Sequence, residues 1–263
     1  MPLSGAVDVN VHLSRWPCRR LPLDETATLV RKLRELGVAS AWCCSFDALL
    51  HRDIAAVNTR LFETCNDAAI AGMLMPLGAI NPMLPDWEED LRRCSEVFRM
   101  PGVRLYPNYH GYKLDAPQFA RLLTIATERK LIVQIAATME DERVQHPMMR
   151  VAPVDITPLP TLIQTIPAAR VVLLNALRGP HGEVISSLRK TPQVSFDFAT
   201  LENVGGVASL IEQVDADRVL YGSHAPFFYP EAATLKIKES ALSDDVARKI
   251  ISGNANRMLN KGA

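Results

Sequence analysis

Short runs of apolar and β-branched residues alternate with amphipathic stretches along the whole chain. The runs VVLLNA and LIVQIAA are almost continuously apolar, which is expected of strands buried on both faces of a parallel sheet. Eight segments have this strand pattern: Val7–Leu13, Ala39–Ser45, Leu74–Ile80, Gly102–Pro107, Leu131–Ala137, Ala169–Ala176, Val194–Thr200 and Arg218–Ala225.

Amphipathic segments separate these strands. In the first of them, Leu29, Leu33 and Leu36 share one stripe, and Gly37 is suited to end the helix in a left-handed conformation. Helical patterns cover Asp24–Leu36, Ile54–Ala69, Trp87–Phe98, Pro117–Arg129, Pro158–Gln164, Gly182–Lys190, Gly206–Val214, Pro230–Ser240 and Ser243–Leu259.

Strands that alternate with helices indicate an α/β fold with a parallel sheet and right-handed crossovers. Eight such units favour closure into a (β/α)8 TIM barrel, and 263 residues suit one barrel domain over 1–263. The competing architecture is an open doubly wound sheet. That fold usually carries a glycine-rich phosphate loop after its first strand, and none is present here.

Composition indicates which binding partners and which cellular compartment are expected. The chain has 29 basic and 29 acidic residues and no basic run, so no nucleic-acid partner is expected. It shows no secretory leader and no apolar run of about 18 residues, so neither export nor a membrane span is expected. Five cysteines without CxxC spacing are typical of reduced thiols, and we expect a cytoplasmic protein.

Candidate chemistry concentrates where the predicted strands end, which is the active-site face of this type of barrel. Asp8, Asn10 and His12 alternate with apolar residues and should share one face of the first strand. All six histidines lie at or just beyond a strand's carboxyl end. Further polar residues at these ends are Arg104, Tyr106, Asn108, His110, Gln134, Asn175, Asp197 and His224.

Four segments, in this order, resemble the amidohydrolase superfamily over nearly the whole chain. They are DVNVHL in the first strand, GVRLYPNYHGYKLD at the fourth, VLYGSHAPFF at the eighth, and SGNANRML in the closing helix. The likeness is greatest to the amidohydrolase-related branch that includes the aminocarboxymuconate-semialdehyde decarboxylases. It implies a TIM barrel and a metal-dependent hydrolase-like site.

The resemblance also shows what has changed. In the family a divalent metal is bound at positions that correspond here to Asn10, His12, Gln134, Asn175 and His224. Only His12 keeps the family's residue type, and carboxamides are poor ligands for zinc, which prefers His, Cys or carboxylate. We therefore expect no tightly bound metal. If any cofactor binds, a divalent metal such as zinc at His12 and His224 is expected.

Three residues are candidate catalytic groups. His12 and His224 stand on adjacent strands of a closed barrel, so they are predicted to meet as a general acid–base pair. The alternative is two hydrogen-bonded histidines in a degenerate pocket. Arg104 could clamp a substrate carboxylate in bidentate fashion, or it could form an ion pair with Asp8 or Asp197.

The remaining candidates would bind substrate. Asn10, Gln134 and Asn175 could orient a substrate carbonyl, or they could form a buried amide network in place of the lost metal. Tyr106, Asn108, His110 and Asp197 are further candidates for the pocket, with His110 among three tyrosines on its loop.

The hypothesis that follows is an amidohydrolase-like hydrolase for a small, carboxylate-bearing molecule, with water activated by His224 or His12. Decarboxylase or lyase chemistry of the same superfamily is the alternative enzyme class. A non-catalytic barrel that binds a small molecule is the alternative outside enzymes. A homodimer is an expectation from the resemblance.

Overall fold

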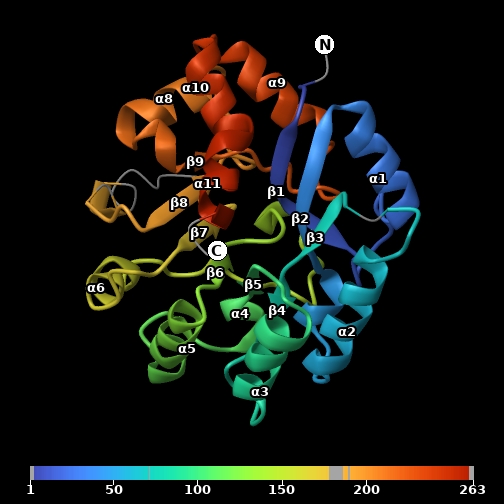
Figure 1. Ribbon diagram of the computed structural model, residues 1–263, viewed down its shortest axis with the longest axis vertical. Helices are drawn as coiled ribbons and strands as arrows, with labels where there is room; N and C mark the ends of the chain where they lie inside the picture. Colours follow the sequence, from blue (N-terminus) through green and yellow to red (C-terminus); the bar gives the residue numbers. More distant parts are fainter. Residues whose placement is uncertain (1–2, 71, 178–185, 189, 261–263) are drawn as a thin grey trace.

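The computed structural model describes residues 3–70, 72–177, 186–188 and 190–260. Parallel strands alternate with helices along the chain, with the strands at the centre and the helices outside them (Figure 1). This confirms the predicted (β/α)8 fold class. Its strands are β1 Ala6–Leu13, β2 Val38–Ser45, β3 Leu74–Pro76, β4 Gly78–Ala79, β5 Gly102–Leu105, β6 Ile132–Ala136, β7 Val171–Leu174, β8 Val194–Asp197 and β9 Val219–Leu220.

Hydrogen-bonded ladders group the strands into two sheets, β1-β2-β3 and β4 to β9 in sequence order. β3 and β4 are the two halves of the strand predicted over Leu74–Ile80. Between them the Leu77 amide still donates to the Cys43 carbonyl of β2 at 2.8 Å. Where β1 meets the segment that follows β9, Val11 forms a β-bridge with Ala225, and the His12 amide donates to the Ala225 carbonyl at 2.9 Å. These contacts bring the first and last strands together.

Helices cover the outside of the strands, as the amphipathic segments predict. They are α1 Thr26–Glu35, α2 Ile54–Cys65, α3 Trp87–Arg92, α4 Pro107–His110, α5 Pro117–Glu128, α6 Leu159–Gln164, α8 Gly206–Gln213, α9 Glu231–Glu239, α10 Asp244–Arg248 and α11 Asn254–Asn260. Two of the predicted helices contain a π-helical turn, η2 Arg93–Val97 after α3 and η5 Lys249–Gly253 between α10 and α11. The helix predicted over Gly182–Lys190 lies largely outside the described residues.

The strand predicted over Gly102–Pro107 is two residues too long. β5 ends at Leu105, and Pro107 instead begins the short helix α4. Proline lacks an amide hydrogen and has a fixed φ, so it fits the first position of a helix, where the amide would have no partner within the helix. The turn places Asn108 and His110 on a helix at the mouth of the barrel.

The predicted alternation along β1 is wrong in detail. Val7 and Val9 pack in the barrel interior, whereas Val11 and Leu13 pack in the outer core beneath the helices. A register shift between Asp8 and Val11 in the pairing with β2 accounts for this change of face. Such a bulge re-aims the side chains that follow it. The irregular register of β1 therefore determines the direction in which the His12 side chain points.

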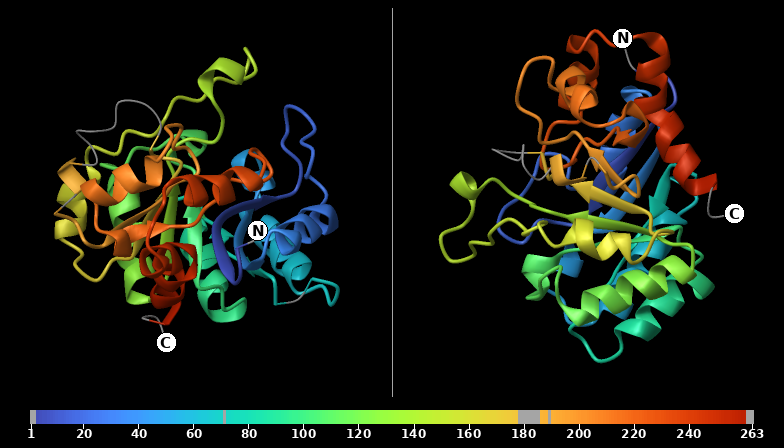
Figure 2. Two further views of the ribbon diagram at one scale, coloured as in Figure 1. Left: turned by 90° about the horizontal axis from the view of Figure 1, so that it is seen from above. Right: turned by 90° about the vertical axis from the view of Figure 1, so that its left-hand side faces the viewer.

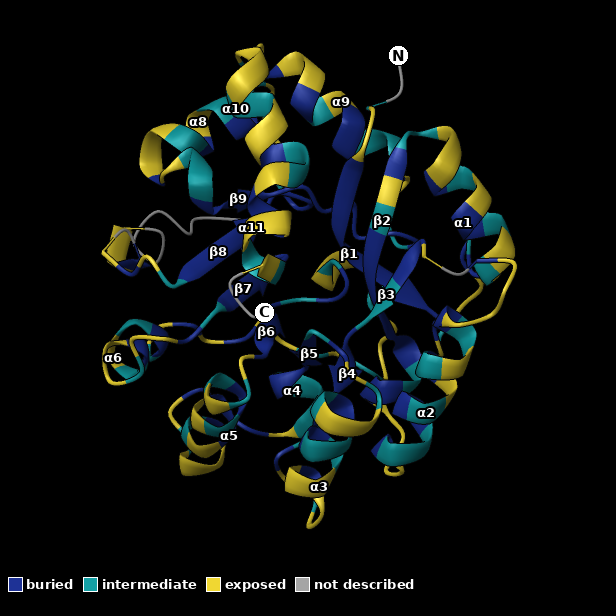
Figure 3. Ribbon diagram, in the orientation of Figure 1, coloured by how far each residue is buried: buried dark blue, intermediate teal, exposed yellow. Residues whose placement is uncertain are grey.

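The core has an outer and an inner part, and most residues of the strands between them are buried, apart from the start of β2 and the end of β3 (Figure 3). The outer part joins the helices to the strands and includes Leu33, Phe119 and Phe196. The inner part fills the barrel with residues such as Trp42 and Leu174. Because both faces of the strands are covered, every polar side chain that points inward needs a partner within the protein.

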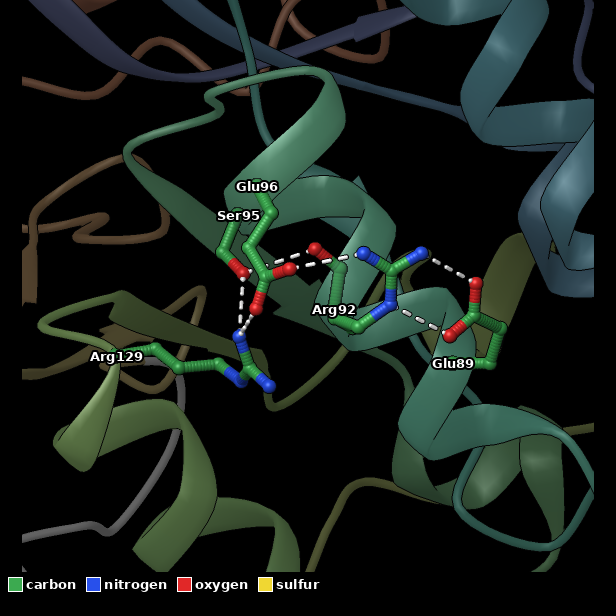
Figure 4. Close-up of polar contacts among 5 residues, drawn as sticks. All are labelled: Glu89, Arg92, Ser95, Glu96 and Arg129. Atoms are coloured by element: carbon green, nitrogen blue, oxygen red, sulfur yellow. Dashed lines mark hydrogen bonds and ion pairs between the residues drawn. The ribbon is translucent and has the colours of Figure 1, made fainter.

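An exposed network of charged residues fastens α3 and η2 to the end of α5 (Figure 4). Arg92 donates to Glu89 at 2.7 Å and to Glu96 at 2.8 Å. Arg129, just after α5, pairs with Glu96 and donates to Ser95 at 3.2 Å. Exposed pairs of this kind contribute roughly 0–1 kcal/mol each, so the network orients the helices more than it stabilises them.

Two segments project from the same side of the barrel: the loop from β1 to α1 and the segment from β6 to α6, which holds η3 Glu142–Val144 (Figure 2). Arg19 of the first pairs with the buried carboxylate of Glu140 in the second. In the part of the chain that the structure describes, no helix is both long and apolar enough to span a membrane.

Candidate active site

His12 and His224 meet at the carboxyl ends of the strands. His12 is the seventh of the eight residues of β1, and His224 follows β9. Their ring centroids are 5.7 Å apart and their planes are inclined by 80°, an edge-to-face contact. Their relative exposures are 0% and 1%. The predicted approach of the two imidazoles is thus present in the structure, inside the protein rather than on an open surface.

Left-handed backbone conformations aim two of the site's side chains. Asn175, just after β7, has φ 57°, and His224 has φ 56°. Residues other than glycine adopt this region only at a cost, although Asn and His do so more often than most. Such strain persists where surrounding contacts hold it. Here the Asn175 amide nitrogen Nδ2 lies 3.2 Å from Nδ1 of His224, so the two strained residues contact each other.

A buried amide–carboxylate network lies beside His224. Asn10 Nδ2 donates to Asn175 Oδ1 and to Asp197 Oδ2, both at 2.8 Å. The Asn175 backbone amide donates to Asp197 Oδ1 at 2.7 Å. A Cβ on Gly222 would stand 2.6 Å from Asp197 Oδ2, so only glycine fits there without displacing the network. These contacts match the amide-network alternative for Asn10 and Asn175.

Arg104 forms a second buried network, on the His12 side. Its Nε donates to Gln134 Oε1 at 2.7 Å, and its Nη1 lies 3.1 Å from Nε2 of His12. The remaining contacts are to three main-chain carbonyls, those of Val9, Val11 and Trp42. Arg104 makes no ion pair with Asp8 or Asp197, and its donors are engaged by acceptors within the protein. The clamp on a substrate carboxylate stays a prediction.

Burial shifts the pKa of the two histidines and the two aspartates of the site towards their neutral forms. Desolvation lowers the pKa of His224 to about 4, and burial together with the Arg104 charge holds the pKa of His12 well below its usual range. Desolvation also raises the pKa of Asp8 to about 6 and raises that of Asp197. Both imidazoles are therefore neutral at pH 7.

An aromatic cap, composed of Trp16, Phe46 and Phe227, covers the two histidines. Phe46 stacks on His12 with centroids 4.8 Å apart, and Phe227 stacks on His224 at 5.0 Å. Trp16 contacts both phenylalanines edge to face, at 5.4 and 4.7 Å. Trp16 is 3% exposed, and its indole Nε1 has no hydrogen-bond partner within the protein.

Sequence reasoning singled out none of Trp16, Phe46 and Phe227. Phe46 directly follows β2, so the rule that selected polar residues at strand ends would have found it if apolar residues had been included. Trp16 lies on the loop after β1. No periodicity or motif in that loop signals its role.

The other predicted site residues lie around this centre. Tyr106 is buried with its ring centroid 6.1 Å from that of His12, and His110 Nε2 donates to the Ala48 carbonyl at 2.8 Å. Asn108 is bonded to the Ala152 carbonyl of the β6–α6 segment and does not reach the two histidines by any described contact. His146 is exposed on that segment.

The fold and this site together define an α/β barrel of the amidohydrolase type. A family model described as Amidohydrolase matches residues 7–261. The chain therefore belongs to the amidohydrolase family, as the four sequence segments predict. Comparison with curated proteins finds no match.

Solved structures with the same fold include several decarboxylases. The 2,6-dihydroxybenzoate decarboxylase from Rhizobium aligns with a TM-score of 0.79 and 13% identity, over 99% of this chain and 100% of that one. The 5-carboxyvanillate decarboxylase from Sphingomonas paucimobilis aligns with a TM-score of 0.71 and 14% identity, over 98% and 99%. At these identities the likeness shows the fold alone.

A third similar structure is a dihydroxybenzoic acid decarboxylase from Polaromonas sp., with bound manganese and the inhibitor 2-nitroresorcinol. It aligns with a TM-score of 0.73 and 12% identity, over 99% of this chain and 98% of that one. The residues present here do not fit such a metal. Among the described residues, no group of three or more His, Cys, Asp or Glu side chains could hold a metal ion. A guanidinium lies against His12 and Gln134 instead.

Proposed function

We propose that this protein is a decarboxylase-type lyase that acts on a small, carboxylate-bearing aromatic molecule at the His12–His224 pair. The observation that carries the proposal is the enclosure of two neutral imidazoles under the aromatic cap. The decarboxylases of the same fold act, by their names, on hydroxylated benzoates and a carboxyvanillate. Their names support the reaction class proposed here.

The surroundings of the pair favour loss of carbon dioxide over hydrolysis. Hydrolysis needs an activated water and donors that stabilise an oxyanion, and the donors of Arg104 are already engaged. Decarboxylation moves negative charge from the carboxylate onto the carbon that keeps the electron pair. An apolar site that removes water from the carboxylate therefore favours this reaction. The aromatic cap supplies such a site over the two imidazoles.

In the proposed reaction the carbon–carbon bond to the carboxylate breaks and its electron pair stays on the substrate carbon. That carbon takes up one proton from the imidazolium form of His12 or His224, which the neutral ring reaches by binding a proton from solvent, and carbon dioxide leaves. Solvent then returns the proton to the imidazole, so the net change is carboxylate plus proton to product plus carbon dioxide. His12 and His224 are the catalytic residues of this proposal.

The indole of Trp16 supports a substrate with an acceptor oxygen. An indole N–H can only donate, and a buried donor without a partner is costly. Trp16 Nε1 is such a donor within the aromatic cap. A carboxylate or phenolate oxygen of the substrate would satisfy it, while the aromatic rings of the cap would stack against the substrate ring.

A panel of hydroxybenzoates and related aromatic diacids, labelled at the carboxylate, tests the proposal. Release of labelled carbon dioxide is expected from the wild-type protein and from His146→Asn, an exposed control, and not from His224→Asn. Hydrolysis of esters, lactones or amides without carbon dioxide release would instead establish a hydrolase. Catalytic release that persists in His224→Asn would remove this histidine from the mechanism.

A second function, a non-catalytic barrel that binds a small molecule, is favoured by one observation. The polar atoms of the Asn10–Asn175–Asp197 network are largely paired with one another, and both histidines are fully enclosed. Enclosed polar groups that are mostly paired are typical of a structural core, and of the side-chain atoms in this network only Asn10 Oδ1 is buried without a partner among the described residues. Tight binding of a panel member by calorimetry, with no turnover over long incubation, would favour this function over the lyase.

A further inference from the structure

The Arg104 guanidinium occupies a cage of acceptors inside the barrel. Gln134 Oε1 accepts at 2.7 Å, and the carbonyls of Val11, Val9 and Trp42 accept at 2.8, 3.1 and 3.3 Å. Arg104 is 0% exposed. A cation buried this deeply is tolerated only when its charge and donors are satisfied, and here neutral carbonyl dipoles satisfy them without a carboxylate in contact.

This cage coincides with part of the family's metal position. Two of the five positions that correspond to metal ligands, His12 and Gln134, contact the guanidinium. The other three, Asn10, Asn175 and His224, bond to one another instead. The five positions thus form two groups: His12 and Gln134 around the Arg104 cation, and Asn10 and Asn175 with His224. The two groups are in contact through the imidazoles of His12 and His224.

The contact with Arg104 has a consequence for the proton on His12. A guanidinium donates hydrogen bonds and accepts none, so the imidazole nitrogen that it contacts must be an acceptor. Arg104 Nη1 lies 3.1 Å from Nε2 of His12 and 3.5 Å from Nδ1. The nearer nitrogen, Nε2, then carries no hydrogen, and a neutral His12 holds its proton on Nδ1.

His224 has the opposite arrangement. Its Nε2 lies 2.7 Å from the carbonyl oxygen of Met139, and a carbonyl only accepts, so the proton of a neutral His224 is on Nε2. Its Nδ1 accepts from the Nδ2 amide of Asn175 at 3.2 Å. The two imidazoles in contact therefore carry their protons on different ring nitrogens.

We infer that Arg104 is a built-in cation that takes the place of the family's divalent metal and acts as a positioning residue, fixing the His12 proton on Nδ1. The inference goes beyond the proposed lyase reaction, because it concerns a ground-state property of the protein without substrate. A barrel that only binds a ligand would show the same tautomers. Failure of the lyase proposal and failure of this inference are therefore separate results.

Imidazole nitrogen NMR at neutral pH tests the inference, because shifts and two-bond couplings distinguish Nδ1–H, Nε2–H and doubly protonated rings. In ¹⁵N-histidine-labelled wild-type protein we expect Nδ1–H for His12 and Nε2–H for His224. We expect the same spectrum with EDTA and with added manganese, and no stoichiometric metal by elemental analysis. His12→Gln and His224→Gln assign the two rings.

Arg104→Gln should move His12 away from the pure Nδ1–H form, whereas Arg31→Gln, an exposed control, should leave it unchanged. Arg104→Lys keeps the charge but loses the planar set of donors, and we expect it to relax the tautomer in part. Nε2–H on His12 in the wild type, or manganese broadening of its resonances, would overturn the inference. If neither Arg104 variant folds, the wild-type tautomer and metal content decide the outcome.

Discussion

The imidazole of His12 meets that of His224 edge to face at 5.7 Å, and each ring has a phenylalanine stacked on its face. The pair joins the first strand to the segment after the last strand. It is also the point where the guanidinium network and the amide–carboxylate network touch. The chemistry of the site depends on how this pair holds and exchanges protons.

Replacement of His224 by Asn should abolish turnover without unfolding the protein. Asparagine tolerates the left-handed backbone at this position, so the variant separates loss of the imidazole from backbone strain. We expect a loss of roughly 100-fold or more in kcat, the usual contribution of a positioned acid or base. Steady-state kinetics and thermal unfolding measure the two effects, with His146→Asn as the control. Unchanged kcat would exclude a catalytic role.

The direction of the pH dependence distinguishes acid from base catalysis. With the pKa of His224 lowered to about 4, its imidazolium form is scarce at neutral pH and increases as the pH falls. If the imidazolium supplies the proton, kcat rises on lowering the pH from about 8 towards 5. A hydrolase that used neutral His224 as a base would show a flat profile in this range, with loss only below it. Circular dichroism at each pH verifies that the protein remains folded.

Asp8→Asn should make stability less dependent on pH. The pKa of Asp8 is raised from 3.8 to about 6 by burial, so the folded state binds more protons than the unfolded state between these values. Stability from this group is present at low pH and is lost as the pH rises through about 6. The stability of the variant relative to wild type should therefore rise by on the order of 1 kcal/mol between pH 5 and pH 8, because more than half of the whole effect falls below pH 5.

Urea unfolding at the two pH values measures this difference. His224 contributes the opposite slope, because its lowered pKa makes stability fall as the pH drops from 6.5 towards 4. That slope is common to both proteins and cancels in the comparison. Asp244→Asn, at an exposed position, is the control and should show no such gain. Equal pH profiles for Asp8→Asn and wild type would contradict the assigned shift.

Trp16→Phe tests whether the unpartnered indole N–H binds substrate. The substitution keeps an aromatic ring in the cap but removes the donor. We expect KM to rise roughly tenfold, the cost of one hydrogen bond to a charged group, with a smaller change in kcat. Trp42→Phe is a matched control, because Trp42 Nε1 is also buried and unpartnered but packs in the inner core. Equal effects of the two substitutions would show that Trp16 acts only through packing.

Gly222→Ala should disrupt the amide–carboxylate network. The added Cβ would approach Asp197 Oδ2 to 2.6 Å and Asp197 Cβ to 2.8 Å, so the carboxylate must shift. We expect a loss of about 1–3 kcal/mol in the free energy of unfolding, as for overpacked cores. Gly253→Ala is the control, since its Cβ would have no neighbour closer than 3.5 Å. A stable Gly222→Ala protein with full activity would show that this close approach is unimportant.

The fold and the centre of the site could be predicted because both follow from local patterns. Apolar runs mark strands that are buried on both faces, and strand ends in a barrel of parallel strands converge on one face. His12 and His224 end neighbouring strands, so their contact follows from topology alone. Their complete burial did not follow, because it depends on what the loops place above them.

Three features of the site could not be predicted from the sequence: the acceptors that Arg104 contacts, the irregular register of β1, and the aromatic cap. Arg104 is long enough to reach carboxylates or carbonyls, and the sequence contains no signal that selects the carbonyls of Val9 and Val11. The register shift between Asp8 and Val11 interrupts a regular alternation without a glycine or proline to mark it. The aromatic cap was missed because the search at strand ends considered only polar side chains.

The bridge between Val11 and Ala225 joins residues at opposite ends of the chain. Contacts of such high sequence separation are slow to form, because the entropy of a long intervening loop is lost before the contact stabilises anything. His12 and His224 flank this bridge and come together only when the ring of strands has closed. The environment of the two imidazoles thus provides a natural probe of late folding. A partly folded barrel can bury most of its strands and still lack the site.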